Sequence, residues 1–221
     1  MVAAVTVERQ DPTEGGLAVF VQVIQGQVTD AEQARAALDR WARELAPGAT
    51  GWLGTTAGVT DDGRFIALAR FESEEAARRN SDRPEQDRWW AETAALFSGE
   101  ATFADSDDVI VDLVGEPGDA GFVQVMRGRG TDTDRARELM AEDSPAWADF
   151  RPDILGSVSV LHEGGAYTMA IYFTSEEEAR EGERKEPPPE LKAQMEEMDA
   201  LSAGPPEFFD LRQPWLYAPA G

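Results

Sequence analysis

The chain has 221 residues, of which 42% are hydrophobic, and its 43 Asp and Glu residues against 20 Lys and Arg residues give a net charge of −23. This composition is typical of a folded globular protein, and the negative charge argues against nucleic acid or an anionic membrane as a partner. Because the chain has no Cys, it has no disulfide framework, no thiolate metal site and no Cys nucleophile.

The first residues, "MVAAVTVERQDPTEGG", lack the basic and apolar regions of a secretory signal. No stretch of the chain approaches the roughly 18 consecutive apolar residues that a membrane-spanning helix needs. We therefore expect a cytoplasmic protein in which residues 1–16 are an N-terminal extension.

An internal repeat organises the rest of the chain. Residues 20–80 align with residues 122–182 without a gap, and 19 of these 61 positions are identical. Beyond a short insertion near "KEPPPE", the segment "LFSGEATFAD" aligns with "LSAGPPEFFD". The repeat predicts two domains, over residues 17–115 and 116–221.

Each copy predicts the same first elements. In the first copy, "VFVQVIQ" is a β-branched, apolar run of strand length that ends at Gly26. Thr29 and Glu32 then form a capping-box pattern at the start of an amphipathic helix, which Pro47 and Gly48 end. The following "GWLGTTAGVTDDGRFIALARF" predicts two strands joined by a tight turn at "TDDG".

A second helical region and a last strand complete the copy. Ser73 is placed to cap one helix, and Pro84 to begin the next. We expect "DVIVDL", at 108–113, to close the unit as its last strand. The order strand, helix, strand, strand, helix, strand predicts an α+β, ferredoxin-like domain with a sheet of about four strands and both helices on one face.

The predicted strands are apolar on both faces, as in "FIALARF" and "YTMAIYF". Both faces of each sheet must therefore be covered, and helices cover only one of them. We expect the two sheets to pack face to face about a pseudo-two-fold axis, as two subunits of a homodimer would. Since the repeat already supplies this contact, we expect a monomer, with a weak homodimer as the alternative.

These features resemble the dimeric α/β-barrel superfamily, and within it the antibiotic biosynthesis monooxygenase-like domains. The resemblance rests on the first strand that ends in Gly before a capped helix, on "ARFESEEAARRN", on a "G-x-x-x-F" pattern before the last strand, and on the domain length. It implies a pocket in each domain between the sheet and its own helices. Its members include cofactor-independent quinone-forming monooxygenases, haem-degrading enzymes, isomerases and binding proteins.

The haem-degrading activity would need an imidazole on the second helical region. The only His, His162, lies in the predicted hairpin "LHEGGAY", where a His is most often a solvated surface residue. We therefore expect no haem, no His-based metal site and no Ser/His/Asp triad, and we predict no cofactor.

A cofactor-independent oxygenase needs a polar group to hold the phenolate of a small aromatic substrate inside a dry aromatic pocket. Gln22 and Gln124 each interrupt the apolar run of a buried-looking strand, so each amide must find a hydrogen-bond partner or a ligand. The equal alternative is that each amide ties its strand to a neighbouring loop.

Other candidate ligand contacts lie at the end of the third strand. The resemblance places Phe71 and Phe173 against a ligand, although an aromatic residue at such a position also serves as plain core. Arg70 and Tyr172 occupy one aligned position, so the two pockets would differ if these side chains point inward.

The segment "RRNSDRPEQDRWW" would roof the first pocket. Asn80 could donate a hydrogen bond to a substrate oxygen, whereas the second copy has Gly182 there. We expect at most one of Trp89 and Trp90 to line the pocket, and we take Trp89 as the wall residue.

Two functions remain open. One is the oxidation of a small phenolic or quinone-type aromatic molecule in the first domain, with Gln22, Asn80 and Arg70 as polar contacts. The other is a non-catalytic tandem domain that binds a small hydrophobic metabolite or serves as a scaffold. A pocket of about 300–1,000 Å³ would favour a ligand site, and a filled cleft would favour the scaffold.

Overall fold

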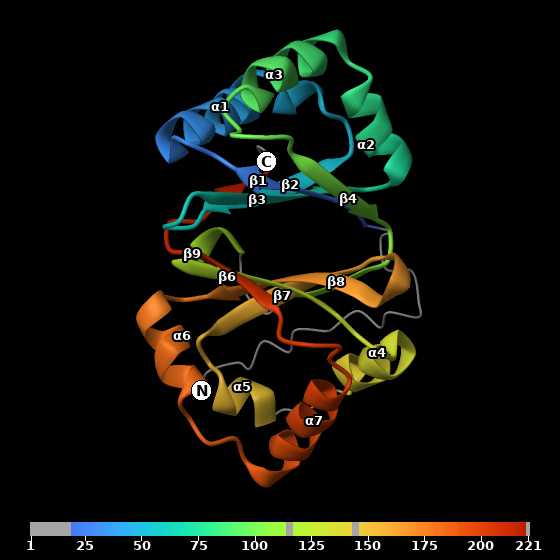
Figure 1. Ribbon diagram of the computed structural model, residues 1–221, viewed down its shortest axis with the longest axis vertical. Coiled ribbons are helices and arrows are strands. Elements are labelled where there is room, and N and C mark those ends of the chain that lie inside the picture. Colours follow the sequence, from blue (N-terminus) through green and yellow to red (C-terminus); the bar gives the residue numbers. More distant parts are fainter. Residues whose placement is uncertain (1–18, 114–116, 143–145, 220–221) are drawn as a thin grey trace, which may run out of the picture.

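The computed structural model describes residues 19–113, 117–142 and 146–219, so the expected N-terminal extension lies outside the described residues (Figure 1). The first copy of the repeat forms β1 (Phe20–Gln27), α1 (Ala31–Glu44), β2 (Trp52–Val59), β3 (Arg64–Phe71), α2 (Glu74–Ser81), α3 (Pro84–Ala94) and β4 (Thr102–Ser106). The second forms β6 (Phe122–Arg129), α4 (Thr133–Ala141), α5 (Ala146–Phe150), β7 (Ile154–Leu161), β8 (Ala166–Phe173), α6 (Glu176–Glu183), α7 (Pro189–Ala200) and β9 (Glu207–Leu211). Two more strands, β5 (Val109–Leu113) and β10 (Trp215–Tyr217), follow β4 and β9, and three short 3₁₀ turns span Ala46–Gly48, Pro117–Asp119 and Glu163–Gly165.

Local sequence signals place most of these boundaries. Ser73 caps α2 by accepting a hydrogen bond from the backbone N–H of Ala76, and Pro84 begins α3, as predicted. Gly63 takes a φ of 82° in the β2–β3 turn, which favours Gly. The capping-box prediction was wrong by one residue: Asp30, not Thr29, caps α1, because its carboxylate accepts from the N–H of Gln33.

The prediction of the last strand of the first copy was also wrong. β4 closes the first four-stranded unit by pairing antiparallel with β1. β5, which contains "VIVDL", instead pairs with β7 of the second copy. In return, β10 pairs with β2 of the first copy. Each sheet therefore has five strands, in the orders β10-β2-β3-β1-β4 and β5-β7-β8-β6-β9.

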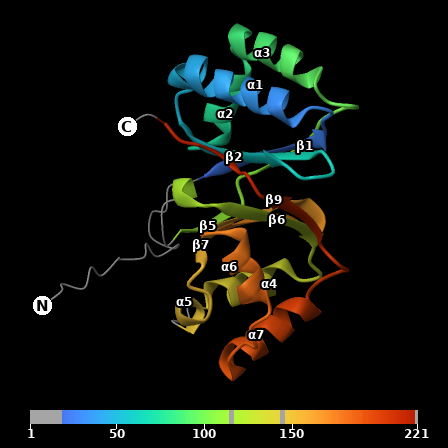
Figure 2. The same ribbon diagram turned by 90° about the vertical axis from the view of Figure 1, so that its left-hand side faces the viewer.

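The two sheets pack face to face, with helices on their outer sides (Figures 1 and 2). Along β1 and β3 the side chains alternate between the two faces of the first sheet. Val21, Val23, Ile66 and Leu68 point to the second sheet and belong to the largest buried cluster, while their neighbours face the helices. The predicted pseudo-dimeric arrangement is confirmed, and both faces of each sheet are covered.

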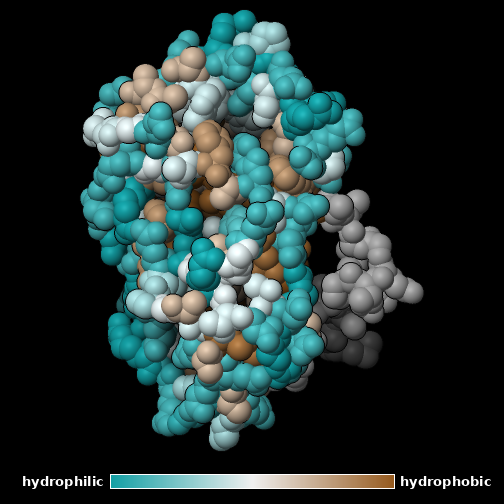
Figure 3. Space-filling view, turned by 45° about the vertical axis from the view of Figure 1, so that its right-hand side comes forward, coloured by the Kyte–Doolittle hydropathy of each residue, from teal (hydrophilic) through white to brown (hydrophobic). Residues whose placement is uncertain are grey.

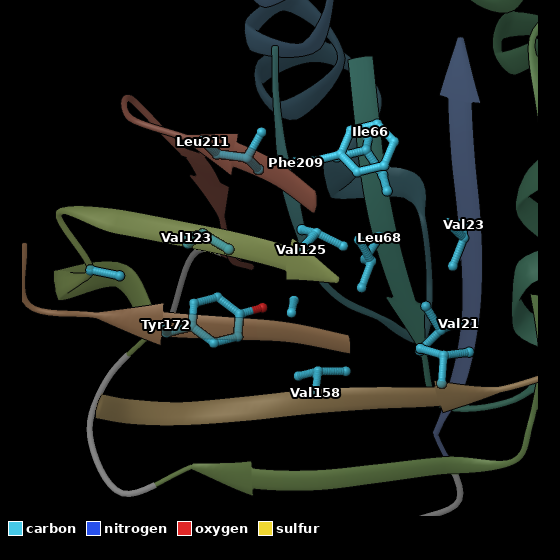
Figure 4. Close-up of a cluster of buried hydrophobic side chains, with 13 residues drawn as sticks. Val21, Val23, Ile66, Leu68, Val123, Val125, Val158, Tyr172, Phe209 and Leu211 are labelled. Atoms are coloured by element: carbon cyan, nitrogen blue, oxygen red, sulfur yellow. The ribbon is translucent and has the colours of Figure 1, made fainter. Parts of the chain in front are cut away.

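The inter-sheet core contains residues of both copies (Figure 4). Val123, Val125 and Val158 of the second sheet meet the valines of β1 across this layer. The Tyr172 side chain is buried there as well, and its hydroxyl lies 2.6 Å from Oγ1 of Thr56 on the opposite sheet. This hydrogen bond satisfies a polar group that would otherwise be costly to bury.

Among the described residues, none of the helices combines the length and the apolar character needed to cross a membrane. The surface in Figure 3 is largely hydrophilic, and hydrophobic side chains show mainly in the gaps between polar ones.

Candidate functional site

A cavity of about 70 Å³ lies between the first sheet and helices α1, α2 and α3. It forms on the helix side of β1 and β3, because alternate residues of these strands point away from the inter-sheet core. Gln22 comes from β1, Phe71 from β3 and Asn80 from α2, while Trp89 and Trp90 come from α3. We call this space the aromatic cavity.

Aromatic rings form most of its wall. The ring of Trp41 on α1 lies 6.3 Å from that of Trp89 and packs edge-on against Trp52, at 5.0 Å between centroids. Trp90 lies between Phe97, at 6.2 Å, and Phe103, at 5.2 Å, and Phe103 is half exposed. The wall is therefore apolar and reaches solvent on the Trp90 side.

The N–H groups of two of the cavity tryptophans are already satisfied by the protein. Nε1 of Trp89 donates to the carbonyl oxygen of Ala37 at 2.9 Å, and Nε1 of Trp41 donates to Oε1 of Gln86 at 2.6 Å. These bonds tie α3 to α1 and fix the roof of the cavity. They leave the amide groups of Gln22, Asn80 and Gln86 as the polar groups best placed to meet a ligand.

Asn80 is buried, and its orientation is set by an arginine. Nη1 of Arg83 donates to Oδ1 of Asn80 at 3.0 Å and to the carbonyl oxygen of Leu45 at 3.0 Å. Since a guanidinium only donates, the amide oxygen must face Arg83 and the NH₂ group must face elsewhere. Nδ2 of Asn80 has no hydrogen-bond partner among the described residues.

Gln22 has a carboxylate partner on the neighbouring strand. Its Nε2 lies 3.4 Å from Oδ2 of Asp105 on β4. Burial raises the pKa of the Asp105 carboxyl, and the negative charge of Glu74 adds to the effect, while the hydrogen bond from Gln22 opposes it. None of the cavity-lining side chains in the described part of the chain is charged. Asp105 is an acidic residue outside the lining that is hydrogen-bonded to a lining residue, Gln22.

The second copy repeats the glutamine–aspartate pair with an additional partner. Nε2 of Gln124 donates to Oδ1 of Asp210 at 2.9 Å, and Asp210 also forms an ion pair with Arg180. The aligned Arg78 of the first copy makes no ion pair within the described residues, so Asp105 has no such cation.

Arg151 occupies the space in the second copy that corresponds to Asn80. A Cβ atom on Gly182, the residue aligned with Asn80, would lie only 2.3 Å from Nε of Arg151. The guanidinium stacks 5.5 Å above the ring of Phe173 and pairs with the buried carboxylate of Asp153 at 2.7 Å. This ion pair fills the place where the first copy has its amide.

The predicted site residues thus fall into three groups. Gln22, Phe71, Asn80 and Trp89 line the aromatic cavity. Gln124 and Phe173 lie at the equivalent positions of the second copy, where each is engaged by neighbouring side chains. Arg70 and Tyr172 do not line the aromatic cavity, because both sit on the alternate strand positions that face the opposite sheet.

Three details differ from the sequence-based expectations. Trp90 lines the cavity together with Trp89, because two successive helix residues are only about 100° apart and the cavity is wide enough to meet both. Trp41 was not predicted to shape the site, since its spacing indicates only a core face, whereas Arg83 lies on the segment that was expected to roof it. His162 is half-buried, with Nε2 3.1 Å from Oγ1 of Thr168, and burial lowers its pKa. The expectation that His162 is a solvated surface residue was therefore wrong.

Comparison with solved structures finds proteins of the same two-domain fold. A candidate monooxygenase from Lactobacillus acidophilus aligns with a TM-score of 0.70 and 12% identity, over 91% of this chain and 96% of its own. A candidate monooxygenase from Fusobacterium nucleatum gives 0.68 and 11%, over 92% and 96%. An anthrone oxidase-like protein gives 0.59 and 15%, over 89% and 93%. The tandem fold that the resemblance implied is therefore confirmed.

The sequence itself matches no protein-family model and no curated protein.

Proposed function

We propose that this chain, which has the two-domain fold of monooxygenase-like proteins, oxidises a small aromatic molecule with O₂ in the aromatic cavity and without a cofactor. One observation carries the proposal: Asn80, whose NH₂ group has no hydrogen-bond partner among the described residues, lines the cavity together with aromatic side chains. A ring-lined site with fixed amide donors suits a planar substrate whose oxygen becomes negatively charged during the reaction.

An anthrone-type ketone illustrates the chemistry. Loss of a proton from its ring CH₂ group gives an enolate, and the N–H of Asn80 would stabilise the charged oxygen. The proton passes to solvent, the enolate reduces O₂, and a C–O bond forms at the former CH₂ carbon to give a peroxide that takes a proton back from solvent. The remaining C–H bond and the O–O bond then break, which releases H₂O and leaves a second carbonyl. The balance is one ketone and one O₂ giving one quinone and one H₂O.

The cavity volume sets a condition on this proposal. At about 70 Å³ the cavity is smaller than the roughly 150 Å³ that benzene occupies in an engineered protein cavity. A fused-ring substrate therefore requires side chains to move, and Trp90 is best placed because its ring already leans on the half-exposed Phe103. We expect binding to be accompanied by rotation of Trp90 toward solvent.

The same small volume favours a second function. A protein that only binds a small hydrophobic metabolite, or serves as a scaffold, needs neither a wide cavity nor an acid or base within it. The lining side chains described above carry no charge, which fits this alternative as well.

Oxygen uptake separates the two functions. We would measure uptake with anthrone and hydroquinone substrates for the wild type and for Gln22→Ala and Asn80→Ala, with Gln124→Ala as the matched control in the second copy. Uptake without added flavin or metal that falls at least tenfold in the first two variants, but not in the control, would support the enzyme. Ligand binding without uptake would support the metabolite-binding protein instead.

A further inference from the structure

The amide groups of the aromatic cavity have fixed orientations, and these orientations restrict what a ligand can present. The evidence is the set of hydrogen bonds that each amide makes outside the cavity. In an amide side chain the oxygen only accepts and the nitrogen only donates, so a bond made by one end determines what the other end offers.

Asp105 fixes the Gln22 amide. A carboxylate accepts hydrogen bonds, so the atom of Gln22 that faces it must be the NH₂ group, at 3.4 Å. Oε1 of Gln22 has no hydrogen-bond partner among the described residues. Gln22 therefore presents an acceptor to the cavity.

Arg83 and Trp41 fix the other two amides in the opposite sense. Arg83 donates to Oδ1 of Asn80, and the indole of Trp41 donates to Oε1 of Gln86. Both amide oxygens are thereby occupied by donors, which leaves the NH₂ groups of Asn80 and Gln86 to face a ligand. The three amides of the cavity thus offer one acceptor and two donors.

From this pattern, and on the basis of the proposed function, we infer that the aromatic cavity selects an aromatic compound that carries both a carbonyl oxygen and a free hydroxyl group. The hydroxyl donates to Oε1 of Gln22, and the carbonyl accepts from the NH₂ of Asn80 or Gln86. An aromatic ketone or aldehyde without the hydroxyl leaves the Gln22 oxygen unpaired, which costs binding free energy.

The second copy shows why Asp105 matters to this selection. Its counterpart Asp210 binds both Gln124 and Arg180, so that carboxylate is shared with a cation. In the first copy Gln22 is the only side chain that donates to Asp105 within the described residues. Asp105 is thus a positioning residue: it acts on the ligand through the orientation of Gln22.

The test uses single-ring probes, because they require the smallest movement of the side chains around the cavity. Isothermal titration calorimetry would compare benzaldehyde, 4-hydroxybenzaldehyde and 2-hydroxybenzaldehyde at a pH that keeps the phenols protonated. The 2-hydroxy isomer bonds its hydroxyl to its own carbonyl and serves as the matched control. We expect the wild type to bind 4-hydroxybenzaldehyde about five- to tenfold more tightly than the other two, as one additional hydrogen bond allows.

Three variants test the cause of this preference. Gln22→Leu removes the acceptor at similar volume, and Asp105→Lys turns the partner of Gln22 into a donor that draws the amide oxygen away from the cavity. Both should abolish or reverse the preference for the 4-hydroxy probe. Gln124→Leu, the equivalent change in the second copy, should leave it intact.

The outcomes distinguish this inference from the proposed function. If the three probes bind with equal affinity, or if Gln22→Leu keeps the preference, the donor–acceptor pattern is overturned while an aromatic-binding cavity stands. If none of the probes binds, both the inference and the proposed function are overturned.

Discussion

Single residues distinguish the two copies of the repeat at the position of Asn80 in the aromatic cavity. The change from Asn80 to Gly182 makes room for Arg151, whose guanidinium covers Phe173. The sequence alignment reveals the Asn-to-Gly difference, but it cannot reveal that a distant Arg fills the gap. That contact depends on how the segment before β7 packs, which no local pattern encodes.

The Arg151–Asp153 ion pair yields a stability prediction. Arg151→Met should cost about 3–5 kcal/mol of unfolding free energy, because it leaves the carboxylate of Asp153 buried and unpaired. Arg151→Met combined with Asp153→Asn should recover a large part of that loss. Urea unfolding of the three proteins measures both effects, and equal losses in the single and double variants would contradict the explanation.

The Asp105 carboxyl yields a pH prediction. Burial raises its pKa in the folded state above the ordinary value of 3.8, so the ionised form is disfavoured by folding. The resulting cost in stability is absent below the unfolded pKa and develops as the pH rises through the folded pKa. Asp105→Asn should therefore be more stable than the wild type at about pH 7, by less than about 1 kcal/mol since the carboxyl is partly exposed.

Unfolding in urea at about pH 7 and about pH 3 checks the sign, because the difference should vanish at the lower pH. Asp210→Asn is the matched control and should not be stabilised, since it removes a charge that binds Arg180. Greater stability of both variants at neutral pH would point to general relief of the negative net charge instead.

At the scale of elements, helices and hairpins were the predictable part. Sequence reveals such local signals because they act on the backbone of neighbouring residues. The examples are the capping side chain of Ser73, the Pro at the start of α3 and the Gly of the β2–β3 turn. The exchange of β5 and β10 was not predictable. A short apolar run such as "VIVDL" indicates a strand, but it carries no information about which of two similar sheets it joins.

The strand β10 offers a test of how much this exchange contributes. The Trp215 side chain is buried against Phe65, and the hydroxyl of Tyr217 donates to Asp39 of α1 at 2.7 Å. Trp215→Ala should cost about 3–5 kcal/mol, as expected for a large buried side chain, whereas Tyr217→Phe should cost about 1 kcal/mol for one hydrogen bond. Thermal and urea unfolding would show whether the two losses differ in this order.

At the scale of the whole molecule, the repeat and the apolar strands were enough to predict two sheets packed face to face. The site was only partly predictable, since the alternation along β3 that turns Arg70 away from the helices depends on the strand register. The large apolar side chains that are exposed in the described part of the chain, Phe103, Val111, Met195 and Phe208, are scattered over different elements. Such isolated residues do not form an interface.

We therefore predict a monomer in solution. The inter-sheet contact that a homodimer would supply is already made within the chain, and residues 19–113, 117–142 and 146–219 expose no extended apolar surface for further association to bury. Size-exclusion chromatography with light scattering at micromolar concentration should give the mass of one chain, 24.1 kDa. A stable dimer would contradict this prediction, and the edge strands with Phe103 and Phe208 would be the first surfaces to alter.

The reciprocal strands also bear on how such a molecule can change by descent. Because β10 belongs to the sheet of the first copy and β5 to that of the second, neither copy can be deleted without removing a strand from the sheet of its neighbour. The second copy can then lose its own binding site and still be retained, because it supplies β10 to the sheet of the first copy. Both domains of such a fused pair are therefore retained even when only one of them binds a ligand.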